Sequence, residues 1–342
     1  MRKYFLLAVM ALSMTVCAKS DDAKRLIDYV NPFVGTDGYG NVYPGAQIPF
    51  GGIQISPDTD EHFYDCASGY KWNRQSIQGF SLTHLSGTGI PDLGDFLFMP
   101  GTGDIKLDPG TDEKPDEGYR SRFSHDEEKA TPGYYGVMLK DYGVKAEMTS
   151  AVRSGIFRFT YPKSDKSFIL IDLNHTLWQK CVWSNIRVEN DSVVTGYKLV
   201  KGWGPERHIY FRAVFSKPLK NFMIYQDQKP VIYNTSRFRS NREAWGPNLM
   251  FTATFATNDS EVVTVKTSIS AISTDGAALN MRELDGMTFD SVKALAEQKW
   301  EKELSTYTIK GTQEQKETFY TSAYHAALCP FVYDDADGSY LG

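Results

Sequence analysis

The chain has 342 residues, of which 41% are hydrophobic and 13% aromatic, enough for one large or two ordinary globular domains. Its formal net charge is −5, so it lacks the basic balance that nucleic-acid binding requires. Of its four cysteines, Cys17 falls in a leader-like segment, and the other three can form at most one disulfide and show no zinc-site spacing. The composition therefore excludes a nucleic-acid-binding protein, a disulfide scaffold and a structural zinc domain.

The first 18 residues have the pattern of an export signal. A basic start is followed by an apolar run that is too short to span a bilayer. Small residues around Ala18 permit cleavage before Lys19, which predicts a signal peptide over residues 1–18 and a periplasmic or extracellular protein. The alternative is a lipid anchor on Cys17. No later run is apolar enough to predict a transmembrane helix.

Three segments are rich in glycine, aromatic and short polar residues: 34–52, 84–95 and 118–136. The second, HLSGTGIPDLGD, lies between strand-like flanks and predicts a long loop, because glycine and proline disfavour helix interiors and central strands. None of the three segments has a phosphate-binding fingerprint, and Ser86 is not in the setting of a serine nucleophile. Aromatic rings beside carboxylates, amides and glycines are typical of sugar sites. The loops at the corners of a large β-sandwich have the same composition. At this point the three segments can therefore be either parts of a sugar site or structural corners.

From about Tyr134 to Ser270 the sequence alternates with period two and is rich in β-branched and aromatic residues. Asn190-Asp191 and Asn258-Asp259 stand where hairpin turns are expected. Because no helical pattern interrupts this region, the sequence predicts a mainly β fold of antiparallel sheets packed face to face. We assign residues 19–275 to this large sandwich.

The pattern changes to helical spacing in segments 287–307 and 312–330. Thr288 or Asp290 is the expected N-cap of the first helix, and Pro330 ends the second. We assign residues 276–330 to a helical linker. The few residues that follow begin a further element, so we expect the chain to be part of something longer.

Three long blocks of the sequence resemble the N-terminal domain of glycoside hydrolase family 92: DYVNPFVGTDGYGNVYPGAQIPFGGIQISPDT, GYKWNRQSIQGFSLTHLSGTGIPDLGDFLFMPGTGDI and GYKLVKGWGPERHIYFRAVFSKPLKNF. The resemblance extends from about Asp28 to Gly342. It implies an exported, calcium-dependent α-mannosidase whose β-supersandwich is joined by linker helices to an (α/α)6 barrel. The active site of such a protein lies where the two domains meet, and residues 331–342 resemble the start of the barrel, whose remainder is missing here.

The resemblance also implies which residues line or brace the mannose site, since the loop at 84–95 projects toward the barrel in this family. The matching positions are Gly38, Trp72, His84, Ser86, Gly87, Thr88, Gly89 and Asp95. His84 is expected either to hold a sugar hydroxyl or to brace its own loop. Asp92 and Asp95 are expected either to accept backbone N–H groups or to reach the ligand.

Enzymes of this family invert configuration, which needs a carboxylic acid and a carboxylate about 6.5–9.5 Å apart. Calcium, which prefers many oxygen ligands, holds the sugar hydroxyls in the family. The resemblance places the acid, the base and most calcium ligands beyond Gly342, so no catalytic or metal-binding residue is expected in this chain. Asp335 and Asp337 lack the spacing of a calcium loop and predict a turn.

Two functions therefore remain open. In the first, the chain is the sandwich and linker of an exo-α-mannosidase that acts on mannose-containing glycans, with α-1,2-linked mannosides of N-glycans or mannans as the expected substrates, and is inactive by itself. In the second, it is a stand-alone carbohydrate-binding sandwich without catalytic activity.

Overall fold

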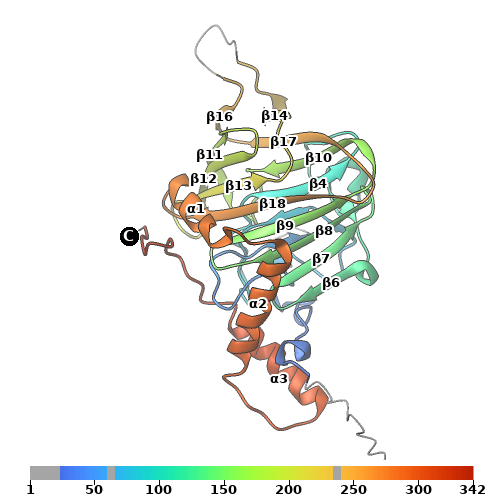
Figure 1. Ribbon diagram of the computed structural model, residues 1–342, viewed down its shortest axis with the longest axis vertical. Coiled ribbons are helices and arrows are strands. Elements are labelled where there is room, and N and C mark those ends of the chain that lie inside the picture. The colour runs from blue at the N-terminus through green and yellow to red at the C-terminus, as the bar shows by residue number, and fades with distance from the viewer. Residues whose placement is uncertain (1–23, 60–65, 234–239, 342) are drawn as a thin grey trace, which may run out of the picture.

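The computed structural model of the protein describes residues 24–59, 66–233 and 240–341. The expected signal peptide at residues 1–18, with Cys17, lies outside these ranges. The described chain is mainly β, with two large antiparallel sheets followed by three α-helices (Figure 1). This confirms the prediction of a sandwich followed by helices.

The smaller of the two sheets has seven strands among the described residues, in the order β1-β3-β4-β10-β17-β14-β15. Their bounds are β1 Ser56–Asp58, β3 Gly79–Ser81, β4 Leu97–Thr102, β10 Ser164–Asp172, β14 Asn221–Gln226, β15 Lys229–Pro230 and β17 Leu249–Thr257.

The larger sheet has nine described strands, in the order β16-β11-β12-β13-β18-β9-β8-β7-β6. Their bounds are β6 Glu128–Thr131, β7 Tyr134–Leu139, β8 Val144–Ser150, β9 Ser154–Tyr161, β11 Lys180–Val188, β12 Val193–Lys201, β13 Arg207–Phe215, β16 Glu243–Gly246 and β18 Glu261–Ser270. Two short strands, β2 (Ser76–Ile77) and β5 (Ser121–Arg122), pair with each other beside the sandwich.

The two expected hairpin turns have different outcomes. Asn190-Asp191 joins β11 to β12, which pair with Val188 opposite Val194, so this hairpin is confirmed. The turn at Asn258-Asp259 instead carries the chain from β17 in the seven-stranded sheet to β18 in the nine-stranded sheet. The prediction of a hairpin there was wrong, because turn-forming residues also serve where a chain switches between sheets.

The core lies between the two sheets, where the inward-facing apolar residues of both meet. Phe98 of β4 contacts Phe157 of β9 and Phe211 of β13, with ring centroids 5.0 and 6.4 Å apart. All three rings are fully buried. Burial of such aromatic side chains from opposite sheets is the main contribution that holds the layers together.

The helices are α1 (Thr274–Met281), α2 (Phe289–Leu304) and α3 (Gln313–Ala326). Thr288 caps α2, as predicted, and exchanges hydrogen bonds with Ser291 in a capping box. Helix α1 was not predicted, since it is short and contains Gly276 and Asn280, two poor helix formers. It forms because the Ser273 side chain caps it and it packs on β18.

Helices α2 and α3 lie below the sandwich in Figure 1, beside the first described residues of the chain. Trp300 of α2 is fully buried and packs against Tyr324 of α3, with ring centroids 4.5 Å apart and planes tilted by 45°. Its indole N–H donates to the Gln47 carbonyl at 2.6 Å. Ile27 and Tyr43 complete the same apolar cluster. The helices are therefore anchored to the rest of the chain through their apolar faces.

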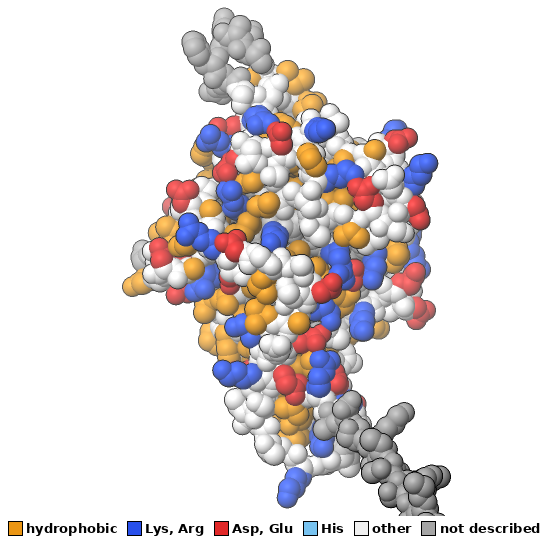
Figure 2. Space-filling view, viewed as in Figure 1, with side chains coloured by type: hydrophobic (Ala, Val, Ile, Leu, Met, Phe, Trp, Pro, Cys, Tyr) orange, Lys and Arg blue, Asp and Glu red, His pale blue; other side chains and the backbone are white. Residues whose placement is uncertain are grey.

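On the face drawn in Figure 2, Lys and Arg side chains are interspersed with Asp and Glu, so this face carries no extended patch of one sign. None of the helices in the described part of the chain is long and apolar enough to cross a membrane.

Candidate functional site

The loop at 84–95 is closed at its base by mutual hydrogen bonds between Thr83 and Asp95. The Thr83 hydroxyl donates to the Asp95 carboxylate at 2.8 Å and accepts the Asp95 backbone N–H at 3.0 Å. The Gly94 N–H also donates to the Thr83 carbonyl at 2.8 Å. Gly94 has φ +77°, and a Cβ there would meet Leu177 at 2.7 Å, so only glycine suits this position. The predicted loop is thus present, with a fixed stem.

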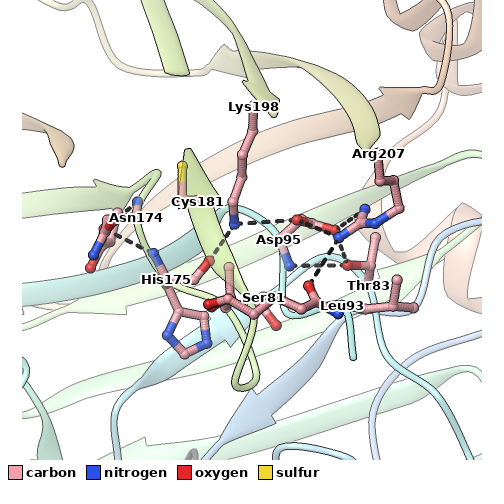
Figure 3. Close-up of polar contacts among 12 residues, drawn as sticks. Ser81, Thr83, Leu93, Asp95, Asn174, His175, Cys181, Lys198 and Arg207 are labelled. Carbon is pink, nitrogen blue, oxygen red and sulfur yellow. Dashed lines mark hydrogen bonds and ion pairs between the residues drawn. The ribbon is translucent and has the colours of Figure 1, made fainter. Parts of the chain in front are cut away.

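Asp95 is fully buried beneath the loop and faces two cations (Figure 3). Arg207 of β13 donates to both carboxylate oxygens, at 2.6 and 3.1 Å, and the Lys198 ammonium of β12 lies 3.2 Å away. Burial alone would raise the pKa of Asp95, but Arg207 and Lys198 hold it well below its usual range. Lys198 also donates to the His175 carbonyl and so joins the loop stem to the segment after β10.

His84 is fully buried and makes its contacts inside the protein. Its Nε2 lies 2.8 Å from an Asp58 carboxylate oxygen, and its Nδ1 lies 2.9 Å from the Gln54 carbonyl oxygen. The other Asp58 oxygen is 2.9 Å from Nε2 of His175. Burial would raise the pKa of Asp58, but the two imidazoles hold it well below its usual range. Of the two roles expected for His84, this geometry favours bracing the loop.

The tip of the loop is the part that faces solvent. Gly87 and Gly89 are exposed, and a Cβ built on either would meet nothing within 4 Å. Ser86 and Thr88 are partly exposed between them, and the Thr88 hydroxyl bonds the Ile90 backbone. Of the site residues predicted in this loop, a ligand can therefore reach these four, Ser86, Gly87, Thr88 and Gly89.

The segment at 34–52 lies against this loop. The Gly87 N–H donates to the Asn41 carbonyl at 2.7 Å, and Lys71 donates to the carbonyl of exposed Gly38. Trp72 follows Lys71 and donates its backbone N–H to Thr36 at 3.0 Å. The fold therefore brings the segments 34–52 and 84–95, with Gly38 and Gly87, into one cluster with Trp72.

Trp72 is half-buried in this cluster, with 37% of its surface exposed. One face of the indole stacks on the His125 imidazole, with centroids 3.6 Å apart and planes 3° from parallel, and Phe33 packs against it edge-on at 5.2 Å. His125 in turn bonds Glu128, whose pKa burial raises. Trp72 thus has packing partners and an exposed part at once.

Sequence reasoning missed the residues that hold the loop in place: Asp58, His175, Lys198 and Arg207. A signal exists for two of them. In β12 and β13, Lys198 and Arg207 occupy the positions of the alternating pattern that face inward. A cation at an inward position predicts a buried partner of opposite charge, which is Asp95. Nothing local in the sequence marks Asp58 or His175.

A cavity of 320 Å³ lies between the loop stem and the segment after α3. Thr83, Leu93 and Arg207 line one side, and the segment 331–335 lines the other. Arg153 holds this segment through Asp334 at 2.8 Å, and Asp335 accepts hydrogen bonds from Ser270 and Asn280, both at 2.7 Å. We call this space the junction cavity.

The carboxylates around the site do not form a metal centre. Among the residues that the structure describes, no group of three or more His, Cys, Asp or Glu side chains is arranged to hold a metal ion. Asp335 instead closes the expected turn, in which the Gly338 N–H donates to the Asp335 carbonyl at 2.9 Å. Half-buried Asp92 bonds the Leu93 N–H at 2.6 Å, and burial raises its pKa. A calcium ion therefore has no ready ligand set in the described chain.

Comparison with known families matches two consecutive domain models. The glycosyl hydrolase family 92 N-terminal domain matches residues 29–270, and the catalytic domain of the same family matches residues 276–342. A sandwich that leads through helices into the first part of a catalytic domain defines the N-terminal part of a glycosyl hydrolase. The chain belongs to glycosyl hydrolase family 92.

Solved structures of the family share the fold. A family GH92 α-mannosidase from Bacteroides thetaiotaomicron, in complex with mannoimidazole, is 70% identical with a TM-score of 0.91 over 93% of this chain and 42% of its own. A family GH92 inverting mannosidase from Bacteroides thetaiotaomicron VPI-5482 is 26% identical, with a TM-score of 0.77 over 92% of this chain and 41% of its own. An uncharacterized secreted glycosidase of Arthroderma benhamiae is 25% identical over 90% of this chain and 42% of its own length. This chain thus spans less than half the length of these relatives.

Proposed function

We propose that the chain is the N-terminal, carbohydrate-contacting part of an exported, inverting exo-α-mannosidase that acts on α-1,2-linked mannosides of N-glycans or mannans. The observation that carries the proposal is the 70% identity to a Bacteroides thetaiotaomicron α-mannosidase over 93% of this chain. Export rests on the leader at 1–18, with Cys17 as the alternative lipid attachment site, and on the secreted relative.

In this proposal the exposed loop cluster contacts sugar and the buried residues position it. Gly38, Trp72, Ser86, Gly87, Thr88 and Gly89 are the candidate contacts, because they combine a partly exposed ring, hydroxyls and open glycine backbone. His84 and Asp95 fix the loop from below, since both are fully buried and bonded to protein groups.

The general acid and base are proposed to lie beyond Gly342. An inverting glycosidase needs one carboxyl group that holds a proton near neutral pH and one carboxylate that can reach a water molecule. Asp58 and Asp95 suit neither role, because both are buried, bonded to cations or imidazoles, and have lowered pKa values. We place the calcium ligands beyond Gly342 as well, since the described residues offer no cluster for the ion.

A chimera tests this function. This chain replaces the matching N-terminal part of the 70%-identical α-mannosidase, and proton NMR follows the hydrolysis of α-1,2-mannobiose with added calcium. We expect mannose that is first released as the β-anomer, which marks inversion. First release of the α-anomer, or a correctly folded chimera that does not hydrolyse any α-mannoside, would contradict the proposal.

The second candidate is a stand-alone carbohydrate-binding sandwich. It is favoured by the anchoring of α2 and α3, whose residues Trp300, Leu304 and Tyr324 are fully buried within the chain. In that case the chimera is inactive, while the chain by itself still binds mannose-containing glycans.

A further inference from the structure

A second cavity, larger than the junction cavity, opens at the end of the sandwich where β10 ends and β11 begins. Its volume is 740 Å³, within the usual range of small-molecule sites. Its lining includes residues 174–176 and 178–181, together with Asp227, Gln228 and Asn248. We call it the end cleft. None of the residues expected from the sequence to contact sugar lines it.

The aromatic residue of the end cleft is Trp178. Its backbone is left-handed, with φ +81°, a conformation that bulky side chains rarely adopt. Such strain usually persists where the surrounding structure enforces it and where it serves a site. Trp178 is not a fully buried core residue, since 50% of its surface is exposed. Trp178 lines the end cleft with half of its surface exposed, so a ligand can reach that part of the side chain.

Next to Trp178, Gln179 contributes a buried hydrogen-bond donor without an acceptor. Gln179 is 9% exposed and lines the end cleft, and its Nε2 has no hydrogen-bond partner within the described chain. Its Oε1 faces Arg207 at 3.4 Å, which turns the amide nitrogen away from that cation. A buried amide donor that lacks an acceptor is unfavourable, and a ligand oxygen would satisfy it.

Asp227, Gln228 and Asn248 add polar groups to the lining, and these groups are held in place. Asp227 and Gln228 both have left-handed backbones, at φ 49° and 61°, and form the turn between β14 and β15. The Asn248 amide donates to the Asp227 carboxylate at 2.7 Å. Lys180 also lines the cleft, so acidic and basic groups are both present. A neutral ligand with many hydroxyl groups fits this lining better than an anion or a cation.

We infer that the end cleft binds a saccharide, with Trp178 as the ring on which a pyranose stacks and Gln179 as a hydrogen-bond donor to it. A pyranose has an apolar C–H face and a rim of hydroxyls, which match an exposed indole beside fixed amides and a carboxylate. The cleft adjoins the candidate site, because the Leu177 N–H donates to the Leu93 carbonyl of the glycine-rich loop at 3.0 Å. The inference goes beyond the proposed hydrolysis, since it concerns binding by this chain alone.

NMR titration of the 342-residue chain with α-1,2-mannobiose tests this inference. The indole N–H signal of Trp178 is assigned by its absence from the Trp178→Ala variant, and it should shift as the disaccharide is added. Trp178→Ala should weaken binding about tenfold or more, which corresponds to about 1.4 kcal/mol. Trp203→Ala is the matched control, because Trp203 is 62% exposed and does not line the end cleft.

A second variant, Gln179→Met, keeps the length of the side chain and removes the donor. It should weaken binding by at least threefold and lower the melting temperature only slightly, because Nε2 has no partner among the described residues and the bond from Arg207 to Oε1 that is lost is long, at 3.4 Å. No shift of the Trp178 signal, or equal binding by the Trp178→Ala and Trp203→Ala variants, would overturn the inference. Neither the NMR shift nor the binding measurement involves hydrolysis. The test of saccharide binding in the end cleft can therefore succeed or fail whether or not the chimera is active.

Discussion

Arg207 of β13 holds both carboxylate oxygens of Asp95, at 2.6 and 3.1 Å, beneath the glycine-rich loop. The same arginine lines the junction cavity and contacts Gln179, which lines the end cleft. This ion pair therefore lies between the two cavities and fixes the base of the loop. The position of the loop depends on a charge pair between distant parts of the chain.

Asp95→Asn should destabilise the protein strongly. The substitution removes the carboxylate that pairs with Arg207 and with Lys198, which is fully buried. Breaking a buried ion pair on one side costs about 3–5 kcal/mol. Urea unfolding measures the effect, and Asp104→Asn is the control, since Asp104 pairs with Lys166 on the exposed surface. Equal midpoints for the two variants would contradict the role of Asp95.

Acid should remove the stabilisation that Asp58 and Asp95 provide. Both have pKa values below the ordinary value, so the folded state binds fewer protons than the unfolded chain. Their contribution is fully present above the unfolded pKa of about 4 and is lost as the pH falls below it. The stability difference between wild type and Asp95→Asn should accordingly shrink below about pH 4. A difference that stays constant down to pH 2.5 would count against the lowered pKa of Asp95.

Much of the fold was predictable because it depends on local pattern. The alternation from Tyr134 onward gave the strands, and Thr288 marked the start of α2. The change of sheet at Asn258-Asp259 was not predictable, because the sequence of a turn does not show with which strand the following strand pairs. At the site, Gly87 and Gly89 were found because glycine-rich loops are visible in a sequence. The cations that pair with Asp95 lie more than a hundred residues away, and only the inward positions of Lys198 in β12 and Arg207 in β13 hinted at them.

His325 of α3 should make stability depend on pH in a higher range. Burial lowers its pKa from 6.5 to about 4, so the folded state favours the neutral imidazole. This contribution is present above pH 6.5 and is lost as the pH falls toward 4, by about 3 kcal/mol in all. His325→Leu should flatten the decline in unfolding free energy between pH 6.5 and 4. A variant whose decline parallels that of the wild type would show that other groups cause it.

Trp72→Ala should separate packing from function. The stack on His125 is worth about 1 kcal/mol, and 37% of the surface of Trp72 is exposed, so the melting temperature should fall only moderately. In the chimera, kcat/KM for α-1,2-mannobiose should fall by tenfold or more if the indole shapes the sugar site. A loss of 3–5 kcal/mol with unchanged kcat/KM would instead make Trp72 a packing residue.

Release of mannose from α-1,2-mannobiose in the presence of calcium distinguishes a sugar-contacting part from a complete catalyst. The purified 342-residue chain and the chimera are assayed side by side at equal concentration. We expect the chimera to release mannose and the chain by itself to release none, since its buried carboxylates Asp58 and Asp95 are already bonded and its described residues offer no calcium site. Calcium-dependent turnover by the 342-residue chain would contradict this and would place the catalytic carboxylates within these 342 residues.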